Sequence, residues 1–211
     1  MCLTNRFFIL AVSLTLTLTC ASEACLAADG KLHFNFEGGN AHGFKAVEGG
    51  AKVFDICKSD IQNLQGDNAV TTLYLNKRKS DEHRMIIESP IFTLSGAKVS
   101  FLVGGGNRPG ACVSICDAKG NEVFKARGTN HIKMQRVKWD GTKHVGKKLF
   151  VRIVDGNLGG WGHITFDDFQ ATGSIDENAT KAYRAKRKKM MPALAKKKKA
   201  RRGKAPKAPI P

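Results

Sequence analysis

The sequence predicts an all-β protein, a single β-sandwich or jelly roll, and two observations carry that prediction. About nine short runs are rich in β-branched or aromatic residues or alternate in polarity, and turn signals of Gly, Asn, Asp and Pro separate them. No convincing amphipathic helix interrupts these runs before residue 174, which argues against alternating strands and helices. Residues 29–173 are therefore expected to form one sandwich domain.

The first expected strand spans 31–37. Its Leu32, Phe34 and Phe36 fall on one face, so this face is expected to pack against a core. Three further runs indicate strands in the first half of the domain: 53–56, 70–75 and 85–94. Pro90 lies inside the last of them and cannot donate a ladder hydrogen bond, so an edge or a bulge is expected there.

The second half of the domain has the same pattern of short strand-like runs. Five of them are 98–103, 111–116, 122–125, 132–139 and 149–154. The turn residues at 117–121 predict a hairpin between two of these strands. A Gly-rich loop that carries Trp161 then leads to a closing strand at 163–169, and its glycines allow the positive φ angles of a tight, irregular connection.

Residues 1–28 are expected to be a signal peptide and not part of the fold. The run 7–18 is mainly apolar and about half as long as a membrane-spanning helix requires. Small residues lead to a cleavage site at Ala27 or Ala28, which is favoured over a lipoprotein anchored at Cys20. The mature protein is expected to be secreted or periplasmic, with no transmembrane segment after cleavage.

The net charge of +17 comes mainly from the C-terminal end of the chain. Residues 181–211 hold ten Lys and four Arg and no acidic residue, which leaves 21 basic against 18 acidic residues, a net of +3, elsewhere. Because like charges repel and Pro192 ends any helix, residues 174–211 are expected to be a disordered Lys/Arg-rich tail. Six basic residues are expected to bind polyanions: Lys196, Lys197, Lys198, Lys199, Arg201 and Arg202.

The partner of this tail is left open by the sequence. The tail has one aromatic residue, Tyr183, so no platform for base stacking is evident. For an exported protein, an anionic polysaccharide or cell surface is a more accessible partner than nucleic acid. A solvated tail without a specific partner is the alternative.

Three of the six cysteines fall in the signal peptide, and Cys57, Cys112 and Cys116 remain. Two residues four positions apart in one strand lie about 13 Å apart, too far for a disulfide. Cys112 and Cys116 are therefore not expected to pair with each other. A bridge from Cys57 to one of them is an alternative to three buried thiols, which are favoured, and no CxxC spacing indicates zinc.

Several segments occur in an order that resembles a known family. They are FE near the start, then SPIFTLSG, FLVGGGNRPG, CVSICDAKGNEV, VKWDGTKHVGKK and RIVDGNLGGWGHITFDDF. Over about 34–169 the chain is similar to the carbohydrate-binding module attached to levanases and related fructan hydrolases. The resemblance implies a galactose-binding-like jelly roll that binds a carbohydrate, fructan-like in that family, and performs no chemistry. The basic tail and the charged run 77–84 depart from the family pattern.

Five loop residues are the expected carbohydrate-binding site. An aromatic face suits the C–H surface of a sugar, and planar polar side chains suit its hydroxyl groups, so Trp161 and His163 are the first candidates. Asp155, Asn107 and Arg108 also lie on loops and are expected to converge at the same end of the sandwich. The structural alternatives are that Trp161 plugs the sandwich, His163 caps a strand, and the other three serve turns.

Glu37 and Asp167 are candidate ligands of a structural calcium ion, the one cofactor considered. Strand alternation would put Ile164, Phe166 and Asp168 on one face and His163, Thr165, Asp167 and Phe169 on the other. A carboxylate among apolar neighbours needs a partner, and calcium takes six to eight oxygens. The resemblance aligns Asp167 with the family's single aspartate. A salt bridge or exposure is the alternative.

No pattern in the sequence predicts catalysis. A nucleophile elbow and an HExxH motif are absent, and no carboxylate pair is distinguished as an acid and a base. The expected function is therefore a secreted, non-catalytic carbohydrate-binding sandwich whose tail adheres to polyanions or a cell surface. The alternatives are an exported protein-interaction or structural domain, and a polyanion or DNA binder that acts through the tail.

Overall fold

The computed structural model describes residues 30–49, 54–57, 61–75, 78–79, 81 and 84–202, without the side chains of 75, 78–79 and 190–202. The expected signal peptide, 1–28, lies outside the described residues. The described strands are β1 (Gly30–Phe34), β2 (Lys45–Gly49), β3 (Asp55–Cys57), β4 (Ala69–Thr71), β5 (Tyr74–Leu75), β6 (Arg78–Lys79), β7 (Met85–Glu88), β8 (Phe92–Leu94), β9 (Lys98–Gly105), β10 (Ala111–Asp117), β11 (Glu122–Ala126), β12 (His131–Asp140), β13 (Lys148–Asp155) and β14 (Ile164–Ile175).

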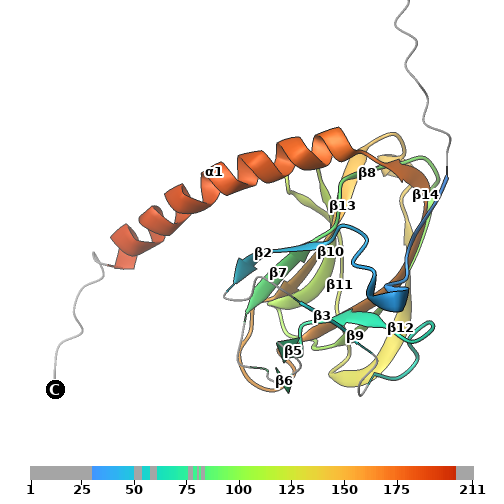
Figure 1. Ribbon diagram of the computed structural model, residues 1–211, viewed down its shortest axis with the longest axis horizontal. Helices are drawn as coiled ribbons and strands as arrows, with labels where there is room; N and C mark the ends of the chain where they lie inside the picture. Colours follow the sequence, from blue (N-terminus) through green and yellow to red (C-terminus); the bar gives the residue numbers. More distant parts are fainter. Residues whose placement is uncertain are drawn as a thin grey trace, which may run out of the picture.

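These strands build a β-sandwich, as the sequence predicts (Figure 1). In the first layer β12 pairs with β9, β9 with β14, and β14 with both β1 and β4, while β3 lies outside β4. In the second layer the order is β11, β10, β13, β7 and β2. Strand β8 pairs with β13 and β14, so the two layers are parts of one continuous sheet. Two short 3-10 helices, Glu37–Gly39 and Thr142–His144, lie in connections.

The core between the layers is aromatic on one side and aliphatic on the other. Phe101, Phe166 and Phe169 of the first layer are fully buried, with ring centroids 5.6–6.5 Å apart. They face a second layer that presents Val, Ile and Ala residues of β10 and β13. Strand β1 closes the core with Leu32 and Phe34, and Phe36 follows it, so their predicted common face is confirmed. Burial of such a side chain contributes about 2–3 kcal/mol, and this cluster defines the sandwich.

The strand expected at 85–94 is two strands, and Pro90 lies between them. β7 belongs to the second layer, whereas β8 connects the layers. Ser89 fixes this crossing, because its N–H donates to the Val151 carbonyl at 2.9 Å and its hydroxyl accepts from the Val151 N–H at 2.9 Å. Pro90 is buried, so it marks the change of layer and not an exposed edge.

The predicted alternation along the closing strand fails at Asp168. Asp167 pairs with Leu102 but Gln170 pairs with Ser100, so β14 carries one extra residue. Asp168 takes a φ of 45° at this β-bulge. The bulge turns Phe169 into the core beside Phe166, so the prediction that Phe169 shares a face with Asp167 is wrong.

The segment expected to be a disordered tail from residue 174 begins with ordered structure. β14 continues to Ile175, and helix α1 spans Glu177–Arg202. The Asp176 side chain caps the helix by accepting from the Ala179 N–H at 2.8 Å. Pro192 lies inside α1, so the prediction that it ends the helix is wrong.

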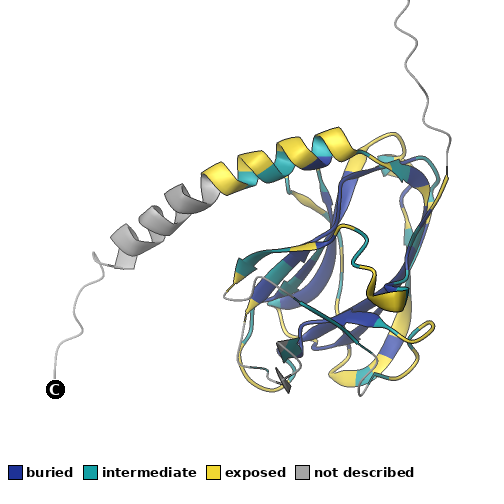
Figure 2. Ribbon diagram, in the orientation of Figure 1, coloured by how far each residue is buried: buried dark blue, intermediate teal, exposed yellow. Residues whose placement is uncertain are grey.

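Helix α1 is docked to the sandwich at its first turns and then extends away from it (Figures 1 and 2). The Thr180 hydroxyl accepts from the Ile91 N–H at 2.8 Å, and the Tyr183 ring lies 4.8 Å from that of Phe150. The six basic residues at 196–202 fall in the part of α1 whose side chains are not described. No helix in the described part of the chain is long and apolar enough to cross a membrane.

Candidate functional site

The structure brings the five predicted carbohydrate-binding residues to one end of the sandwich. Asn107 and Arg108 lie in the β9–β10 connection, as predicted. Asp155 is the last residue of β13 and does not lie on a loop, and the β13–β14 connection that follows it carries Trp161 and His163. The two connections are joined by backbone hydrogen bonds of 2.8 Å, from the Gly106 N–H to the His163 carbonyl and from the Gly156 N–H to the Gly110 carbonyl. We call this end the rim, defined by residues 105–110 and 155–163.

Trp161 holds a strained backbone conformation at the rim. Its φ is 60°, in the left-handed region that bulky residues rarely adopt. The Asp81 carboxylate accepts from the Trp161 N–H at 3.2 Å and contacts His163 Nδ1 at 2.8 Å. The Trp161 and His163 rings lie 5.6 Å apart. Asp81 is separated by eighty residues in sequence from this loop, and no local pattern in the sequence identified it.

Gly106 makes the close contact between the two connections possible. A Cβ at this position would lie 2.0 Å from the Trp161 carbonyl oxygen, so any other residue would push the loops apart. The glycines at 104–106 therefore allow close packing of the backbone. No helix or GK[ST] sequence follows them, so the sequence does not predict a phosphate-binding loop here.

Asp155 is a buried carboxyl below the rim, with 2% of its surface exposed. Its Oδ1 has no hydrogen-bond partner within the described part of the chain. Burial raises the pKa of Asp155 to about 7, and the charge of Asp81 adds to this, against hydrogen bonds from Thr72 and Asn157. The carboxyl is thus close to half protonated near neutral pH.

The five residues differ in how far solvent reaches them. Asn107 and Arg108 are exposed and Trp161 is half-buried, whereas His163 is buried. Arg108 Nη1 donates to the Leu158 carbonyl at 3.2 Å, which fixes its side chain across the rim. In this arrangement a ligand at the surface meets Asn107, Arg108 and Trp161, with the other two residues beneath them.

The two candidate calcium ligands face the same loop, 64–68. The Glu37 carboxylate accepts from the N–H groups of Asp67 and Asn68, each at 3.0 Å. Asp167 is fully buried and accepts from the Gln65 N–H at 2.9 Å. Burial raises the pKa of Asp167 to about 7, and the charges of Asp168 and Glu37 add to it. Both carboxylates therefore accept hydrogen bonds from backbone amides. Asp167 is not exposed and forms no ion pair with a described residue, so neither structural alternative applies to it.

The oxygen donors at Glu37 and Asp167 are of the type that calcium prefers, but part of their lone pairs already accept amide hydrogens. Among the described residues, no group of three or more His, Cys, Asp or Glu side chains is placed to hold a metal. A structural calcium ion at Glu37 and Asp167 stays a prediction.

The thiols of Cys112 and Cys116 are buried and free, and neither forms a bridge with Cys57. Cys57 is half-buried, so the prediction of three buried thiols holds for two of them. Burial raises the pKa of Cys116 to about 11. A thiol in this state is a poor nucleophile, so these cysteines act as small core residues.

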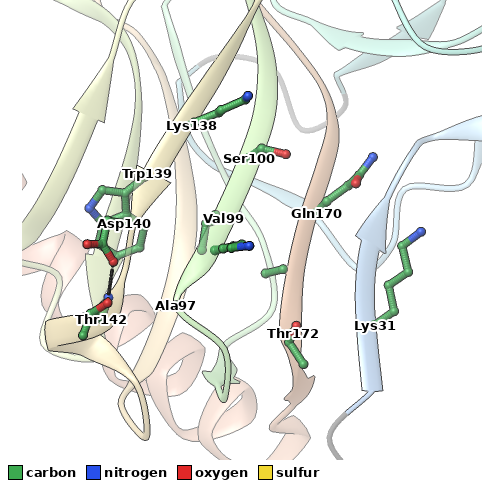
Figure 3. Close-up of a pocket in the computed structure, with 12 residues that line it drawn as sticks. Lys31, Ala97, Val99, Ser100, Lys138, Trp139, Asp140, Thr142, Gln170 and Thr172 are labelled. Carbon is green, nitrogen blue, oxygen red and sulfur yellow. Dashed lines mark hydrogen bonds between the residues drawn. The ribbon is translucent and has the colours of Figure 1, made fainter.

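A groove of about 960 Å³ on the outer face of the first layer was not predicted from the sequence (Figure 3). It crosses β12, β9, β14 and β1. The lining residues are Lys31, Ala97, Lys98, Val99, Ser100, Lys138, Trp139, Asp140, Thr142, Gln170, Ala171 and Thr172. Polar residues at alternate strand positions are typical of any solvent-facing sheet, so no sequence signal distinguished this groove.

Loop 61–68 explains why only half of this outer face is open. Ile61 and Leu64 pack on Leu102 and Met134 and cover the other half. At the border between the halves, Asp168 is buried and is contacted by three side chains that belong to the sheet face. They are His33 at 2.6 Å, Arg136 at 2.5 Å and Gln170 at 2.9 Å. Burial opposes the ionised form of Asp168, but these hydrogen bonds hold its pKa below the usual value.

Comparisons with known proteins give one curated relative and several solved structures. No family model matches the chain. The chain is 30% identical over 146 residues to the protein named "Putative glycosyl hydrolase ecdE" of Aspergillus rugulosus, across 66% of this chain and 20% of that protein. The chain thus spans about one fifth of the length of this relative.

Two of the similar solved structures are the K2 cleaved adhesin domain of Lys-gingipain and TmCBM61 in complex with beta-1,4-galactotriose. The first has a TM-score of 0.47 and 17% identity and covers 68% of this chain and 99% of that chain. The second has a TM-score of 0.43 and 21% identity and covers 67% of this chain and 94% of that chain.

Proposed function

We propose that this chain is an exported, non-catalytic β-sandwich that binds a carbohydrate at the rim. The observation that carries the proposal is the conformation of Trp161, whose left-handed backbone is held by Asp81 and by the contact with Gly106. Such a conformation costs about 1–3 kcal/mol and persists where the surroundings enforce it, often at ligand sites. The loop thereby presents a half-buried indole beside exposed polar side chains.

The chemistry of the exposed rim residues suits a sugar. The indole of Trp161 offers an apolar face for the C–H surface of a ring. Arg108 supplies N–H donors and Asn107 supplies both a donor and an acceptor for hydroxyl groups. The fructan preference of the family that the sequence resembles remains part of this proposal, as does export.

The non-catalytic part of the proposal is supported by the position of the carboxyl groups. A glycosidase needs two carboxyl groups about 5–9.5 Å apart, flanking the scissile bond in an open cleft. Asp155 lies beneath the rim with 2% exposure, so a sugar at Trp161 does not reach it in this arrangement. The curated relative is named a glycosyl hydrolase, and the matched segment makes up 20% of its length, which is consistent with a binding domain inside a larger carbohydrate-active protein.

A glycan array that includes levan and inulin tests the proposal with the chain from residue 29 onward. Trp161→Ala is expected to lower affinity for the sugar that binds by more than about tenfold, the usual effect of removing an aromatic anchor. The matched control is Trp139→Phe, which keeps a ring against Phe124 on the first layer, 5.5 Å away. A folded Trp161→Ala protein that binds as the unchanged protein does would contradict the rim site.

A second function, adhesion to polyanions through α1, is favoured by a specific observation. The described part of α1 exposes Lys181, Lys186, Lys188 and Lys189, and the chain beyond them adds further Lys and Arg. Clustered cations bind dense polyanions by releasing counterions, so binding should weaken steeply with salt. Binding to heparin that is unaffected by reversing these charges would contradict this function.

A further inference from the structure

We propose that the groove across β12, β9, β14 and β1 is a second binding site. Its ligand is an acidic oligosaccharide, and the carboxylate groups of that sugar contact the lysines of the groove. The site lies on the face of the first layer, apart from the rim, and its ligand class differs from the neutral sugar proposed there. The inference therefore stands independently of rim binding. It rests on the groove's free lysines, its hydroxyl and amide groups, and the pairing of the neighbouring charges (Figure 3).

The groove has an excess of cations over anions. Lys31, Lys98 and Lys138 are exposed and form no ion pair with any residue that the structure describes. Asp140 is the one acidic residue among those that line the groove. Its Oδ1 already accepts from the backbone N–H of Thr142 at 3.0 Å and from the Thr142 hydroxyl at 2.5 Å. Three lysines against one carboxylate leave the groove with a net positive charge.

The strand register arranges these groups as an array. Lys138, Ser100 and Gln170 are consecutive partners across β12, β9 and β14, and Lys31 pairs with Thr172 two residues further along. Four strands at a spacing of ~4.8 Å put the lysines of β12 and β1 roughly 14 Å apart across the sheet. Lys98 lies between them on β9. A short oligosaccharide lying across the strands can place carboxylates near all three ammonium groups.

Of the neighbouring carboxylates, Asp140 is the cross-strand partner of Lys98 but forms no ion pair with it in the structure. Asp168, the nearest buried carboxylate on this face, is occupied by Arg136 and His33. Gln170 donates from Nε2 to both Asp168 oxygens at 2.9 Å. This fixes its amide and leaves its carbonyl oxygen to accept a hydroxyl. Ser100 and Thr172 add hydroxyl groups along the same surface.

The groove lacks the stacking face that a neutral sugar or a nucleic-acid base would use. The Trp139 ring stacks on Phe124 at 5.5 Å and packs against His144 at 5.3 Å, so it is engaged with other side chains. Attraction here has to come from ammonium groups and hydrogen bonds. That chemistry favours a uronic-acid oligosaccharide over an uncharged one.

Calorimetry with trigalacturonate and the uncharged galactotriose tests the proposal on the chain from residue 29 onward. Trigalacturonate is expected to bind at least tenfold more tightly than galactotriose, with affinity falling as salt rises. The variant Lys31→Glu, Lys98→Glu and Lys138→Glu is expected to lose this binding by at least tenfold. Equal affinity for the two sugars, or binding that survives the triple variant, would overturn the proposal.

The matched control reverses three exposed basic residues outside both the groove and α1, Lys45→Glu, Lys119→Glu and Arg127→Glu, with the same change in net charge. It is expected to keep trigalacturonate affinity within about twofold, and a loss equal to that of the groove variant would show that net charge, and not the groove, sets the affinity. If the triple variant unfolds, the single exposed substitution Lys98→Ala replaces it in the test. A Lys98→Ala protein with unchanged affinity for trigalacturonate would count against the groove.

Two further comparisons separate this site from other outcomes. Trp161→Ala is expected to leave trigalacturonate binding unchanged, so failure at the rim and failure at the groove are distinguishable. A sulfated heparin trisaccharide and a trinucleotide are expected to bind the groove more weakly than trigalacturonate. Equal or tighter binding of either one, lost in the groove variant, would overturn the assignment to carboxylate sugars.

Discussion

Two carboxyl groups are almost fully buried in the second layer, and they differ in their ionic partners. Glu88 on β7 accepts from Arg152 Nε at 2.8 Å and from the Tyr183 hydroxyl at 3.2 Å, and Arg187 of α1 approaches it at 3.4 Å. Asp155, three residues beyond Arg152 on β13, forms no ion pair within the described residues, and each of the two carboxyl groups keeps one oxygen without a hydrogen-bond partner there. Both side chains are only 1–2% exposed.

The difference separates a charge that holds the fold together from one placed near a binding surface. Glu88 fastens α1 to the sandwich, because two of its partners belong to the helix and the third to the paired strand β13. Asp155 forms no ion pair within the described residues, and burial raises its pKa to about 7 although the charge of Arg84 opposes this. It lies where the loops of the rim meet. A buried carboxyl without an ion pair is costly, so its retention there is consistent with a functional role for the rim.

Replacing Glu88 should give the largest loss of stability. Glu88→Ala leaves Arg152 and Arg187 facing a buried space without a counter-charge, which is expected to cost about 3–5 kcal/mol in the free energy of unfolding. Urea denaturation measures this loss. Glu48→Ala is the control, since Glu48 also pairs with Arg187, at 3.5 Å, but is 40% exposed. This substitution is expected to cost less than about 1 kcal/mol. Equal losses for the two variants would contradict the structural role of Glu88.

Asp155→Asn should change how stability depends on pH. The folded pKa of Asp155 is about 7, against about 4 in an unfolded chain, so the folded protein holds more protons between these values. Stability of the unchanged protein should therefore fall as pH rises through this window, by up to about 1 kcal/mol per unit from this group. Asp167, whose pKa burial also raises to about 7, contributes a slope of the same sign, so the variant should lose about half of the total slope in urea denaturation between pH 5 and pH 7.

The control for the pH experiment is Asp117→Asn. Desolvation is the largest single effect on the pKa of Asp117 and raises it, but hydrogen bonds from Asn121 and neighbouring backbone groups together outweigh it and lower the pKa, so this group titrates below the window. Its variant should keep the slope of the unchanged protein between pH 5 and pH 7. An Asp155→Asn protein with the same slope would show that Asp155 is ionised in the folded state.

Tyr183→Phe should have the smallest effect of the three. It keeps the ring against Phe150 and removes the hydroxyl that bonds Glu88 and Arg152. Loss of these two hydrogen bonds to charged groups, both 3.2 Å long, is expected to cost about 1–2 kcal/mol. Comparing the melting temperatures of Tyr183→Phe and Glu88→Ala separates the contribution of the hydroxyl group to stability from that of the ion pairs. An unchanged melting temperature would assign the docking of α1 to packing and Arg187 alone.

Most strands were predictable because their signals are local. Alternation over 31–37, apolar runs at 98–103 and 149–154, and turn residues at 117–121 all match strands or turns of the structure. The β-bulge at Asp168 was not predictable, since neither composition nor spacing marks an extra residue in one strand. That one residue decided which side chains of the closing strand enter the core.

The convergence of the rim residues was predictable in part. Loop order placed Asn107, Arg108, Asp155, Trp161 and His163 at one end, and the structure brings them together. Asp81 was missed because its contact with His163 spans 82 residues, and burial of Asp155 depends on strands from distant parts of the chain. The docking of α1 was missed for a similar reason: helix propensity was visible, but Ile91, Phe150 and Glu88 anchor it from other elements.

What the sequence alone determined is the β-sandwich class, the position of its strands and the basic C-terminal end, because strand propensity, turn chemistry and charge are properties of neighbouring residues. Only the tertiary structure decided which charges are paired. Glu88 meets Arg187, Asp168 meets Arg136, and the groove lysines meet no described partner, because pairing depends on which distant strands become neighbours in the sheet. Free energy of ion pairing is a function of distance and burial, and the fold alone sets both.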